Sequence, residues 1–438
     1  MKRFLLFCAL CGWVGFRAGA QTTLDTIGVT ALLAADPTLT GSGQYVAQAE
    51  ATNDTQGLQF EVNPGSPGQP VKLFTYRGRT GSAGTFPNNV GSESTHGDAV
   101  AEALYGEYTG VAPGLRHVAN DEALYFLTKV ITLNAPSRER VFNQSFVIGP
   151  HDASYDLIYD NYIALYHTVI VTAAGNSGTV TTPADCYNGL GVAAYGGASA
   201  VGPSTDGRCK PDITAPAPAT SFSTPLVSGA AAVLMQEGQR MGINAAAAID
   251  PRTIKALLLN GAEKPSDWTH TATAPLDPNY GAGVLNVYNS YEDLKGGRHG
   301  PAARMLSAVA THAPLTSGVA GTVARGWDYR AIASSATEQA VNHYRITTSG
   351  TGALISTLVW NKGYNATGIN RLGLYVYDSG GTLLGSSVST VDNVQHLYIT
   401  GLTPGTYDLE VVKNGGKDGT PGMVSGREIY SLAWDFER

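Results

Sequence analysis

The sequence has little charge and no cluster of positive charge. Charged residues make up 14% of the chain, well below the typical fraction of about a quarter. The 28 Lys and Arg are outnumbered by 35 Asp and Glu, which gives a formal net charge of −7. Because nucleic-acid-binding proteins carry basic patches or stripes, this composition argues against a nucleic-acid partner.

Long hydrophobic runs are also scarce. Lys2 and Arg3 precede an apolar stretch that ends at Ala18-Gly19-Ala20, which is the layout of a secretory signal peptide. The stretch is shorter than the roughly 20 apolar residues that span a bilayer, and no other segment could span one. We therefore predict no transmembrane segment, a signal peptide over 1–20 cleaved after Ala20, and a secreted or periplasmic protein.

Cysteine is rare as well. Two of the four cysteines, Cys8 and Cys11, leave with the predicted signal peptide. Cys186 and Cys209 remain, an even pair in an exported and therefore oxidising setting. A disulfide between them is the hypothesis that this setting suggests.

The length of 438 residues exceeds one ordinary hydrophobic core and favours two domains. From about 40 to 295, short Val-rich runs that end at Gly or Asn alternate with helix-like patterns, which is typical of a parallel sheet with helices on both faces. In such sheets function collects at the carboxyl ends of the strands. Glu50, Ser145 and Asn176 fall at these ends.

Beyond about residue 298 the pattern changes to short strands of alternating apolar and polar residues, separated by Gly, Asn, Asp and Pro turns. This spacing predicts a smaller, all-β domain, a sandwich of jelly-roll type. The predicted organisation is an α/β domain over 21–298, with a short N-terminal extension over 21–40, and a β-sandwich over 299–438.

Two further residues, His96 and Ser221, join Asn176 where an α/β domain places chemistry. His96 begins a helical pattern, Asn176 ends a strand in a turn of small residues, and Ser221 opens the stretch "SFSTPLVSGAAAVLM". A helix start offers backbone N–H groups and the positive end of the dipole, which stabilise an oxyanion. Each residue alone has an ordinary explanation as a cap, a turn former or a structural histidine. Their order after the carboxylate of Glu50 is what indicates a serine hydrolase.

The sequence blocks around these residues resemble the subtilisin-like serine proteases, the subtilase family. "ATSFSTP" at 219–225 is similar to the family's GTSxATP, and "HGDAVAE" at 96–102 to its HGTHVAG. The AAGN block is intact at 173–176, and "GRCKPDITAPA" at 207–217 resembles GRxKPDxxAPG. The resemblance covers roughly residues 40 to 295 and implies a subtilisin-like fold.

The resemblance also implies the roles of the catalytic residues. Ser221 would attack the peptide carbonyl, His96 would take its proton, and Asn176 with the Ser221 N–H would bind the oxyanion. The family's triad acid is Asp, whereas this chain has Glu50 at that position. Asp54, four residues further on, is the alternative acid.

Ser145, Phe146 and Gly175 are expected to bind substrate. Ser145 and Phe146 stand where the family usually has an SxG block along the substrate, and Gly175 belongs to the AAGN block that supplies Asn176. The resemblance implies an endopeptidase that acts on proteins or peptides and requires neither a metal nor a cofactor for its chemistry. Structural calcium is common in the family, and irregular calcium sites cannot be read from one chain.

Two other functions would also use parts of this pattern. A pseudoprotease that serves as a binding or scaffold protein would keep the fold and lose turnover through Glu50 and an altered cleft, but has no use for His96, Asn176 and Ser221 together. A lipase or esterase is excluded because Ser221 does not lie in a GxSxG turn.

The segment 389–412 resembles β-sandwich domains that are appended to secreted bacterial proteases. Such a domain could bind substrate or a surface, support folding in place of a prodomain, or only stabilise its neighbour.

Overall fold

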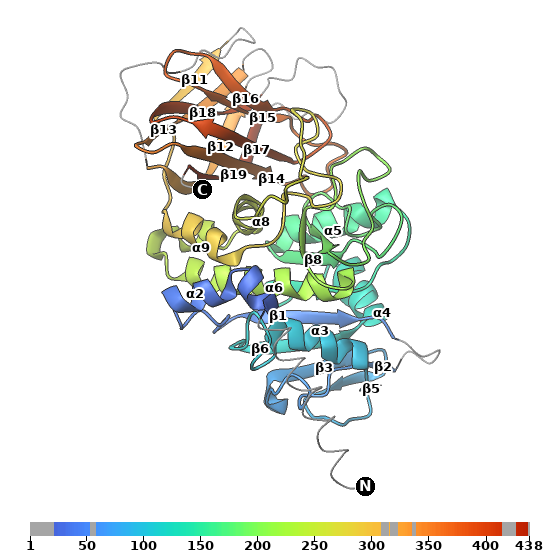
Figure 1. Ribbon diagram of the computed structural model, residues 1–438. Helices are drawn as coiled ribbons and strands as arrows, with labels where there is room; N and C mark the ends of the chain where they lie inside the picture. The colour runs from blue at the N-terminus through green and yellow to red at the C-terminus, as the bar shows by residue number, and fades with distance from the viewer. Residues whose placement is uncertain are drawn as a thin grey trace.

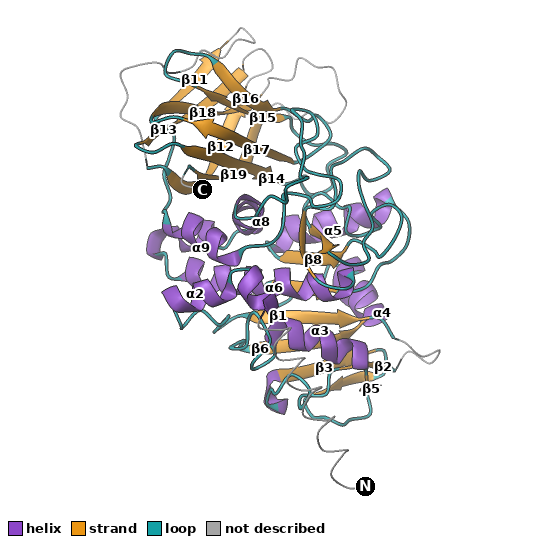
Figure 2. Cartoon of the chain, in the orientation of Figure 1, coloured by secondary structure: helices purple, strands orange, loops and turns teal. Residues whose placement is uncertain are grey.

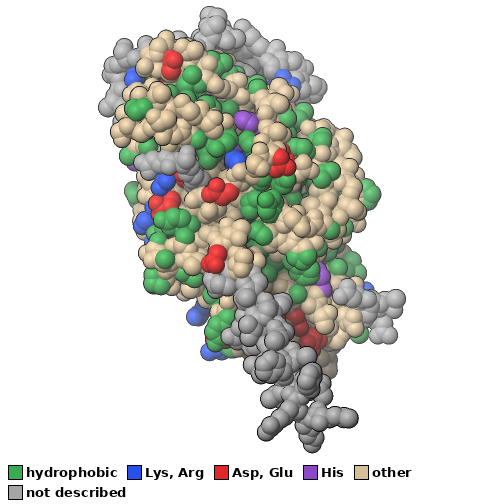
Figure 3. Space-filling view, viewed as in Figure 1, with side chains coloured by type: hydrophobic (Ala, Val, Ile, Leu, Met, Phe, Trp, Pro, Cys, Tyr) green, Lys and Arg blue, Asp and Glu red, His purple; other side chains and the backbone are tan. Residues whose placement is uncertain are grey.

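The computed structural model describes residues 22–52, 58–307, 315, 323–334, 339–413 and 426–436. The predicted signal peptide and Asp54 lie outside these residues. Figure 1 shows an α/β unit that carries a second, all-β unit on the side of α8 and α9. On the face shown in Figure 3 charged groups are scattered among apolar and neutral ones. None of the helices described is both long enough and apolar enough to cross a membrane.

An eight-stranded sheet forms the centre of the first unit. Its strands, in spatial order, are β10 (Ile213–Pro216), β9 (Leu190–Tyr195), β8 (Val169–Ala173), β7 (Val141–Gln144), β1 (Tyr45–Glu50), β6 (His117–Glu122), β3 (Phe74–Gly78) and β4 (Gly81–Ala83). All neighbouring strands are parallel except β3 and β4. The carboxyl ends of β1, β7 and β8 therefore meet at one edge.

Helices cover both faces of this sheet (Figure 2). The main ones are α3 (Thr95–Tyr105), α5 (Ala153–Tyr166) and α6 (Thr220–Gln239). Val169 and Val171 of β8 belong to the core cluster that contains α6, whereas Ile170 belongs to the cluster that contains α5. Since alternate residues of a strand point to opposite faces, both faces are buried, which accounts for the continuous apolar runs in the sequence.

Smaller elements complete the unit. They are α2 (Val29–Ala35), β2 (Gln59–Glu61), η1 (Val71–Leu73), β5 (Ser92–Glu93), α4 (Ala123–Tyr125), η2 (Phe126–Thr132), η3 (Gly242–Asn244), α7 (Ala245–Ala248), α8 (Pro251–Asn260) and α9 (Val287–Lys295). Val29 and Leu32 of α2 join the same core as α6, so part of the predicted extension over 21–40 is packed onto this unit.

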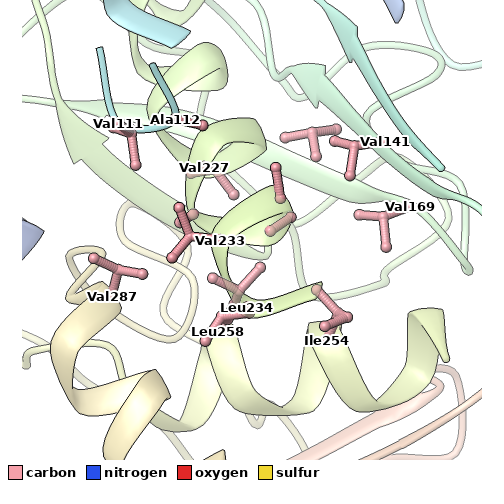
Figure 4. Packing of buried hydrophobic residues seen from close by; sticks show 14 of the residues in the cluster. Val111, Ala112, Val141, Val169, Val227, Val233, Leu234, Ile254, Leu258 and Val287 are labelled. Carbon is pink, nitrogen blue, oxygen red and sulfur yellow. The ribbon is translucent and has the colours of Figure 1, made fainter. Parts of the chain in front are cut away.

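The small residues of α6 let it run through the middle of the unit. Gly229 lies so close to Val111 that a Cβ on it would come within 2.6 Å of the valine side chain. Figure 4 shows Leu234 of α6 next to Leu258 of the neighbouring helix, while Val141 and Val169 face α6 from the sheet. Nearly every residue of α6 after its first turn is buried.

The second unit is a sandwich of two antiparallel sheets. One has the order β11-β13-β18-β15-β16 and the other β12-β19-β14-β17. The strands are β11 (Ala303–Ser307), β12 (Arg325–Ser334), β13 (Gln339–Thr348), β14 (Gly352–Trp360), β15 (Leu372–Tyr377), β16 (Leu383–Ser387), β17 (Val394–Leu402), β18 (Gly405–Lys413) and β19 (Gly426–Asp435). Leu374 and Leu409 from one sheet pack with Leu358 and Trp434 from the other. The predicted fold class, an α/β sheet followed by a β-sandwich, is confirmed.

Helix α8 joins the two units. All 10 of its residues are buried, because one side packs into the α/β core and the other side faces β14 and β19. Thr253 shares a hydrogen bond with Ser431 at 2.8 Å, and Thr357 donates one to Asn260 at 3.1 Å. The sandwich is therefore part of the packing of the α/β unit.

The expected disulfide is absent, because Cys186 and Cys209 are both free thiols. Cys186 is buried in the cluster around α5, whereas Cys209 packs against the α6 core and its backbone N–H donates to Asp392 of the sandwich. The two side chains thus belong to different core clusters. Burial raises the pKa of both thiols.

A buried ion-pair cluster lies between the sheet and α8. Lys210 and Lys255 place their Nζ atoms 2.6 and 2.8 Å from the carboxylate of Asp212. Lys255 also donates to the carbonyl of Gly189 at 2.7 Å. The two lysines lower the pKa of Asp212, although burial itself would raise it.

Asp212→Ala should destabilise the protein strongly, because it leaves two buried lysines without their carboxylate. We expect a loss of about 3–5 kcal/mol in the free energy of unfolding, measured by urea denaturation. Asp36→Ala is the matched control, since its partner Arg240 is 41% exposed and such pairs contribute about 0–1 kcal/mol. Equal effects of the two substitutions would contradict this account.

Candidate active site

Glu50 and His96 form a hydrogen-bonded pair at the carboxyl edge of the sheet. Glu50 is the last residue of β1, and His96 lies in the first turn of α3, which the Ser94 side chain caps by accepting from the Gly97 N–H. The Oε2 atom of Glu50 lies 2.8 Å from Nδ1 of His96. The carboxylate is fully buried, whereas the imidazole is 29% exposed. One ring nitrogen is thus engaged inside the protein, and the ring itself reaches solvent.

Gln48 holds the other oxygen of this carboxylate. Its amide donates to Glu50 Oε1 at 2.9 Å and to the carbonyl of Gly97 at 2.8 Å. The amide oxygen in turn accepts from the Tyr105 hydroxyl at 2.5 Å. Both oxygens of Glu50 are therefore fixed, one by Gln48 and one by His96, so the longer side chain is held in a single orientation.

The pair sets the charge of the imidazole. The hydrogen bond from Glu50 raises the pKa of His96 above that of a free histidine, burial works in the opposite direction, and the negative charge of Glu50 raises it further. When the ring is neutral, Nδ1 carries the proton and its N–H donates a hydrogen bond to the carboxylate. The Nε2 lone pair is then available to accept a proton.

Ser221 lies in the first turn of α6, beside this histidine. The ring of the next residue, Phe222, packs against the His96 ring with centroids 5.6 Å apart. The Ser221 hydroxyl donates to the backbone carbonyl of Ser145 at 3.1 Å. Among the described residues no hydrogen bond joins Ser221 to His96, so the hydroxyl must turn away from Ser145 before it can reach the imidazole.

Pro225 explains one of the two hydrogen bonds that join Ser145 and Ser221. In an α-helix the N–H of residue 225 would bond to the carbonyl of residue 221, but proline has no N–H. The carbonyl of Ser221 accepts instead from the Ser145 hydroxyl at 2.8 Å. The end of β7 and the start of α6 are thereby held together.

A chain of buried side chains continues from this contact. Ser145 Oγ accepts from the Asn143 amide at 3.0 Å, and Asn143 Oδ1 accepts from the Ser228 hydroxyl at 2.9 Å. Ser228 lies two turns along α6 from Ser221. The position of Ser145 is therefore fixed by its own strand and by α6.

Asn176 follows β8 and is anchored through its oxygen. Its Oδ1 accepts from the backbone N–H of Thr220 at 2.9 Å and from the Thr220 hydroxyl at 2.8 Å. Two donors at Oδ1 settle the orientation of the amide, so Nδ2 points away from Thr220. Asn176 is exposed, which leaves this N–H₂ group accessible next to Ser221.

The three residues expected to bind substrate differ in how they are placed. Gly175 has φ +104°, a conformation that favours glycine, and its carbonyl accepts from the Ala200 N–H at 2.6 Å. Ser145 is buried against Ser221, as described above. Phe146 is half-buried and packs against the apolar cluster around α5, so much of its ring faces the protein core.

Two groups of potential metal-binding side chains occur among the described residues: His151, Asp156 and Asp185, and, in the sandwich, His343, Asp408 and Glu410. In the first group Arg208 Nη2 lies 3.2 Å from Asp156, so a guanidinium already supplies positive charge. Burial beside Asp185 raises the pKa of Asp156 to about 7. Neither group includes Glu50, His96 or Ser221.

Comparison with known proteins relates the α/β unit to a protein family. Residues 75–283 match the model of the subtilase family, Peptidase S8. The chain carries a subtilase domain. The match contains His96, Ser145, Asn176 and Ser221, and it begins after Glu50. Subtilases are serine peptidases.

Similar solved structures include tripeptidyl peptidase 2, at 16% identity over 79% of this chain, with a TM-score of 0.38. The chain spans 40% of the length of that protein. A protease from Pseudoalteromonas arctica is 17% identical over 58% of this chain and 90% of its own, with a TM-score of 0.41. The psychrophilic subtilisin-like protease Apa1 from the Antarctic psychrotroph Pseudoalteromonas sp. AS-11 is 11% identical over 60% and 96%, with a TM-score of 0.40.

Several side chains around the candidate site were not singled out from the sequence of this subtilase domain. Gln48 lies two residues before Glu50 on β1, so the two side chains point to the same face of the sheet. Thr220 stands directly before Ser221. These spacings are signals in the sequence that both residues lie near the site. Asn143 and Ser228 had no such signal. They meet only because β7 and α6 are neighbours in the folded chain.

The carboxylate of Glu50 should determine the titration of His96. In Glu50→Gln the hydrogen bond to a charged acceptor is lost while burial still disfavours the charged ring, so the pKa of His96 should fall. NMR titration of the ring Cε1–H resonances measures this directly. The resonance of His117, which has no contact with Glu50, is the internal control and should not move. An unchanged pKa of His96 would show that Glu50 does not stabilise the imidazolium.

Proposed function

We propose that the protein is an exported serine endopeptidase that hydrolyses peptide bonds in proteins or peptides. The observation that carries the proposal is the 2.8 Å contact between the buried carboxylate of Glu50 and Nδ1 of a partly exposed His96. This contact leaves Nε2 of the imidazole toward solvent, at the start of a helix next to the Ser221 turn. A buried acid, a histidine and a serine in this order are the parts of a catalytic triad.

In the proposed reaction the Ser221 hydroxyl first exchanges its acceptor, from the Ser145 carbonyl to Nε2 of His96, by rotation of its side chain. Its Oγ then attacks the substrate carbonyl carbon while His96 takes the proton. His96 gives that proton to the leaving amine, and an acyl-enzyme remains on Ser221. Water, deprotonated in turn by His96, hydrolyses the ester and restores the enzyme.

Asn176 is proposed to stabilise the oxyanion of the tetrahedral intermediate. Thr220 holds its Oδ1 through two hydrogen bonds, so the Nδ2 group is oriented before substrate arrives. With the backbone N–H of Ser221 it would provide two donors, and one such donor is worth about 10²–10³ in kcat. The positive end of α6 adds to the same effect. This chemistry needs no metal or cofactor.

The sandwich is proposed to support the peptidase domain and not to act as a free binding module. The buried helix α8 packs between the two units, and hydrogen bonds such as that from the Cys209 N–H to Asp392 join them. Attachment to substrate or to a surface would use the parts of the sandwich that face away from α8. Export through the signal peptide over 1–20 remains part of the proposal.

Labelling with a fluorophosphonate probe tests the nucleophile. The purified chain should form one covalent adduct, located by mass spectrometry on Ser221, because an activated serine attacks the phosphorus as it attacks a carbonyl. Ser221→Ala should form none. A folded wild-type protein that stays unlabelled would contradict the proposal and favour a pseudoprotease.

Kinetic comparison of two substitutions identifies the acid. Glu50→Gln should lower kcat by about 10⁴ with KM little changed, because the triad acid acts in the transition state. Asp54→Asn is the matched control, a second carboxylate on the same segment, and should leave kcat close to that of the wild type. The reverse result would transfer the role of the acid to Asp54.

A further inference from the structure

A cavity of about 790 Å³ lies between the two units and is rich in arginine. From the subtilase unit it is lined by Arg140, by His167 at the end of α5 and by Asp250 at the start of α8. The sandwich and the segment that leads to it contribute four more arginines, namely Arg298, Arg304, Arg330 and Arg427. One ligand in this cavity would touch both units.

The acids around this cavity are already in ion pairs. Asp250 accepts two hydrogen bonds from Arg252, at 2.8 and 2.9 Å. Asp328 is shared between Arg298 at 3.0 Å and Arg330 at 2.6 Å. Among the residues that line the cavity, five guanidinium groups face one carboxylate, that of Asp250, which leaves an excess of four positive charges. This excess is the reverse of the net charge of the chain, which is −7.

Three of the arginines form no salt bridge with a described residue: Arg140, Arg304 and Arg427. The negative charge of Asp250 still acts on Arg140. Arg304 and Arg427 are exposed, and Arg140 is half-buried. The Nε atom of Arg140 is buried without a hydrogen-bond partner in the part of the chain that the structure describes. A buried N–H without an acceptor is costly, so the described protein groups do not fully satisfy this guanidinium.

The cavity is separate from the candidate active site. Arg140 directly precedes β7, whereas Ser145 directly follows it. His167 likewise stands before β8, and Asn176 after it. Because these strands are parallel, the arginine cavity lies at their amino ends, and Ser145, Asn176 and Ser221 lie at their carboxyl ends. An occupant of the cavity would not block substrate.

We propose that this cavity, called here the arginine pocket, binds a small anion that carries two or more oxyanion groups and bridges the subtilase unit and the sandwich. Arginine presents a planar fork of N–H donors that matches phosphate, sulfate and carboxylate oxygens. Donors from both sides of the cavity require more than one such group on the ligand. A volume of about 790 Å³ falls within the range of small-molecule sites.

Isothermal titration calorimetry of the full chain with orthophosphate, pyrophosphate and tripolyphosphate tests the proposal. Affinity should rise with the number of phosphate groups and fall with added salt, since each group can engage a further arginine. Citrate, a tricarboxylate, shows whether the pocket requires phosphorus or only several oxyanions. No binding of either tripolyphosphate or citrate would overturn the proposal. Equal affinity for orthophosphate and tripolyphosphate would rule out a ligand with several groups.

Substitution of arginines inside and outside the pocket shows whether tripolyphosphate binds in the arginine pocket. Arg304→Gln with Arg427→Gln removes two exposed arginines and should leave the fold unchanged, so affinity for tripolyphosphate should fall by about tenfold or more. Arg140→Gln should give a similar loss. Arg116→Gln, an exposed arginine outside the pocket, is the matched control and should bind as the wild type does. Undiminished binding by the double variant, or an equal loss in Arg116→Gln, would overturn the assignment.

Discussion

The carbonyl oxygen of Ser221 lacks its usual helical donor, because Pro225 occupies the position whose N–H would supply it. The hydroxyl of Ser145 fills this vacancy, and the carbonyl of Ser145 accepts from Ser221 in return. This reciprocal pair ties the first turn of α6 to the end of β7. The candidate nucleophile, Ser221, is therefore held at the carboxyl end of β7, at the edge of the sheet where β1 and β8 also end. Glu50 and Asn176 come to the same edge because β1 and β8 are parallel neighbours of β7.

Strands β1 and β8, on either side of β7, supply a hydrogen-bond acceptor and a hydrogen-bond donor to the site. Strand β1 ends in a carboxylate whose two oxygens are both held, one by Gln48 and one by His96. Strand β8 leads to an amide whose oxygen is held by Thr220. In each case a neighbour that takes no direct part in the chemistry fixes the orientation of the group that does. Pre-oriented groups of this kind need no reorganisation when charge develops during a reaction.

Much of this arrangement could be predicted from the sequence, because it follows from local patterns. Apolar runs buried on both faces identified the parallel sheet, and alternation identified the sandwich. Glu50, His96 and Ser221 each mark the end of a strand or the start of a helix. What could not be predicted depends on contacts between segments far apart in the chain. The separation of Cys186 from Cys209, the contact of Asn143 with Ser228 and the arginine pocket all arise from packing, which one sequence without its fold does not show.

The burial of α8 has a consequence for the order in which the protein can be made. Its outer side rests on β14 and β19, and β19 lies between β12 and β14 in its sheet. These strands come late in the chain, long after the segments that supply Glu50, His96 and Ser221. The cover over the outer side of α8 is incomplete until β19 has been synthesised, because β14 alone covers only part of it. The subtilase unit therefore reaches its final packing only after the strands of the sandwich have been made and have docked on α8.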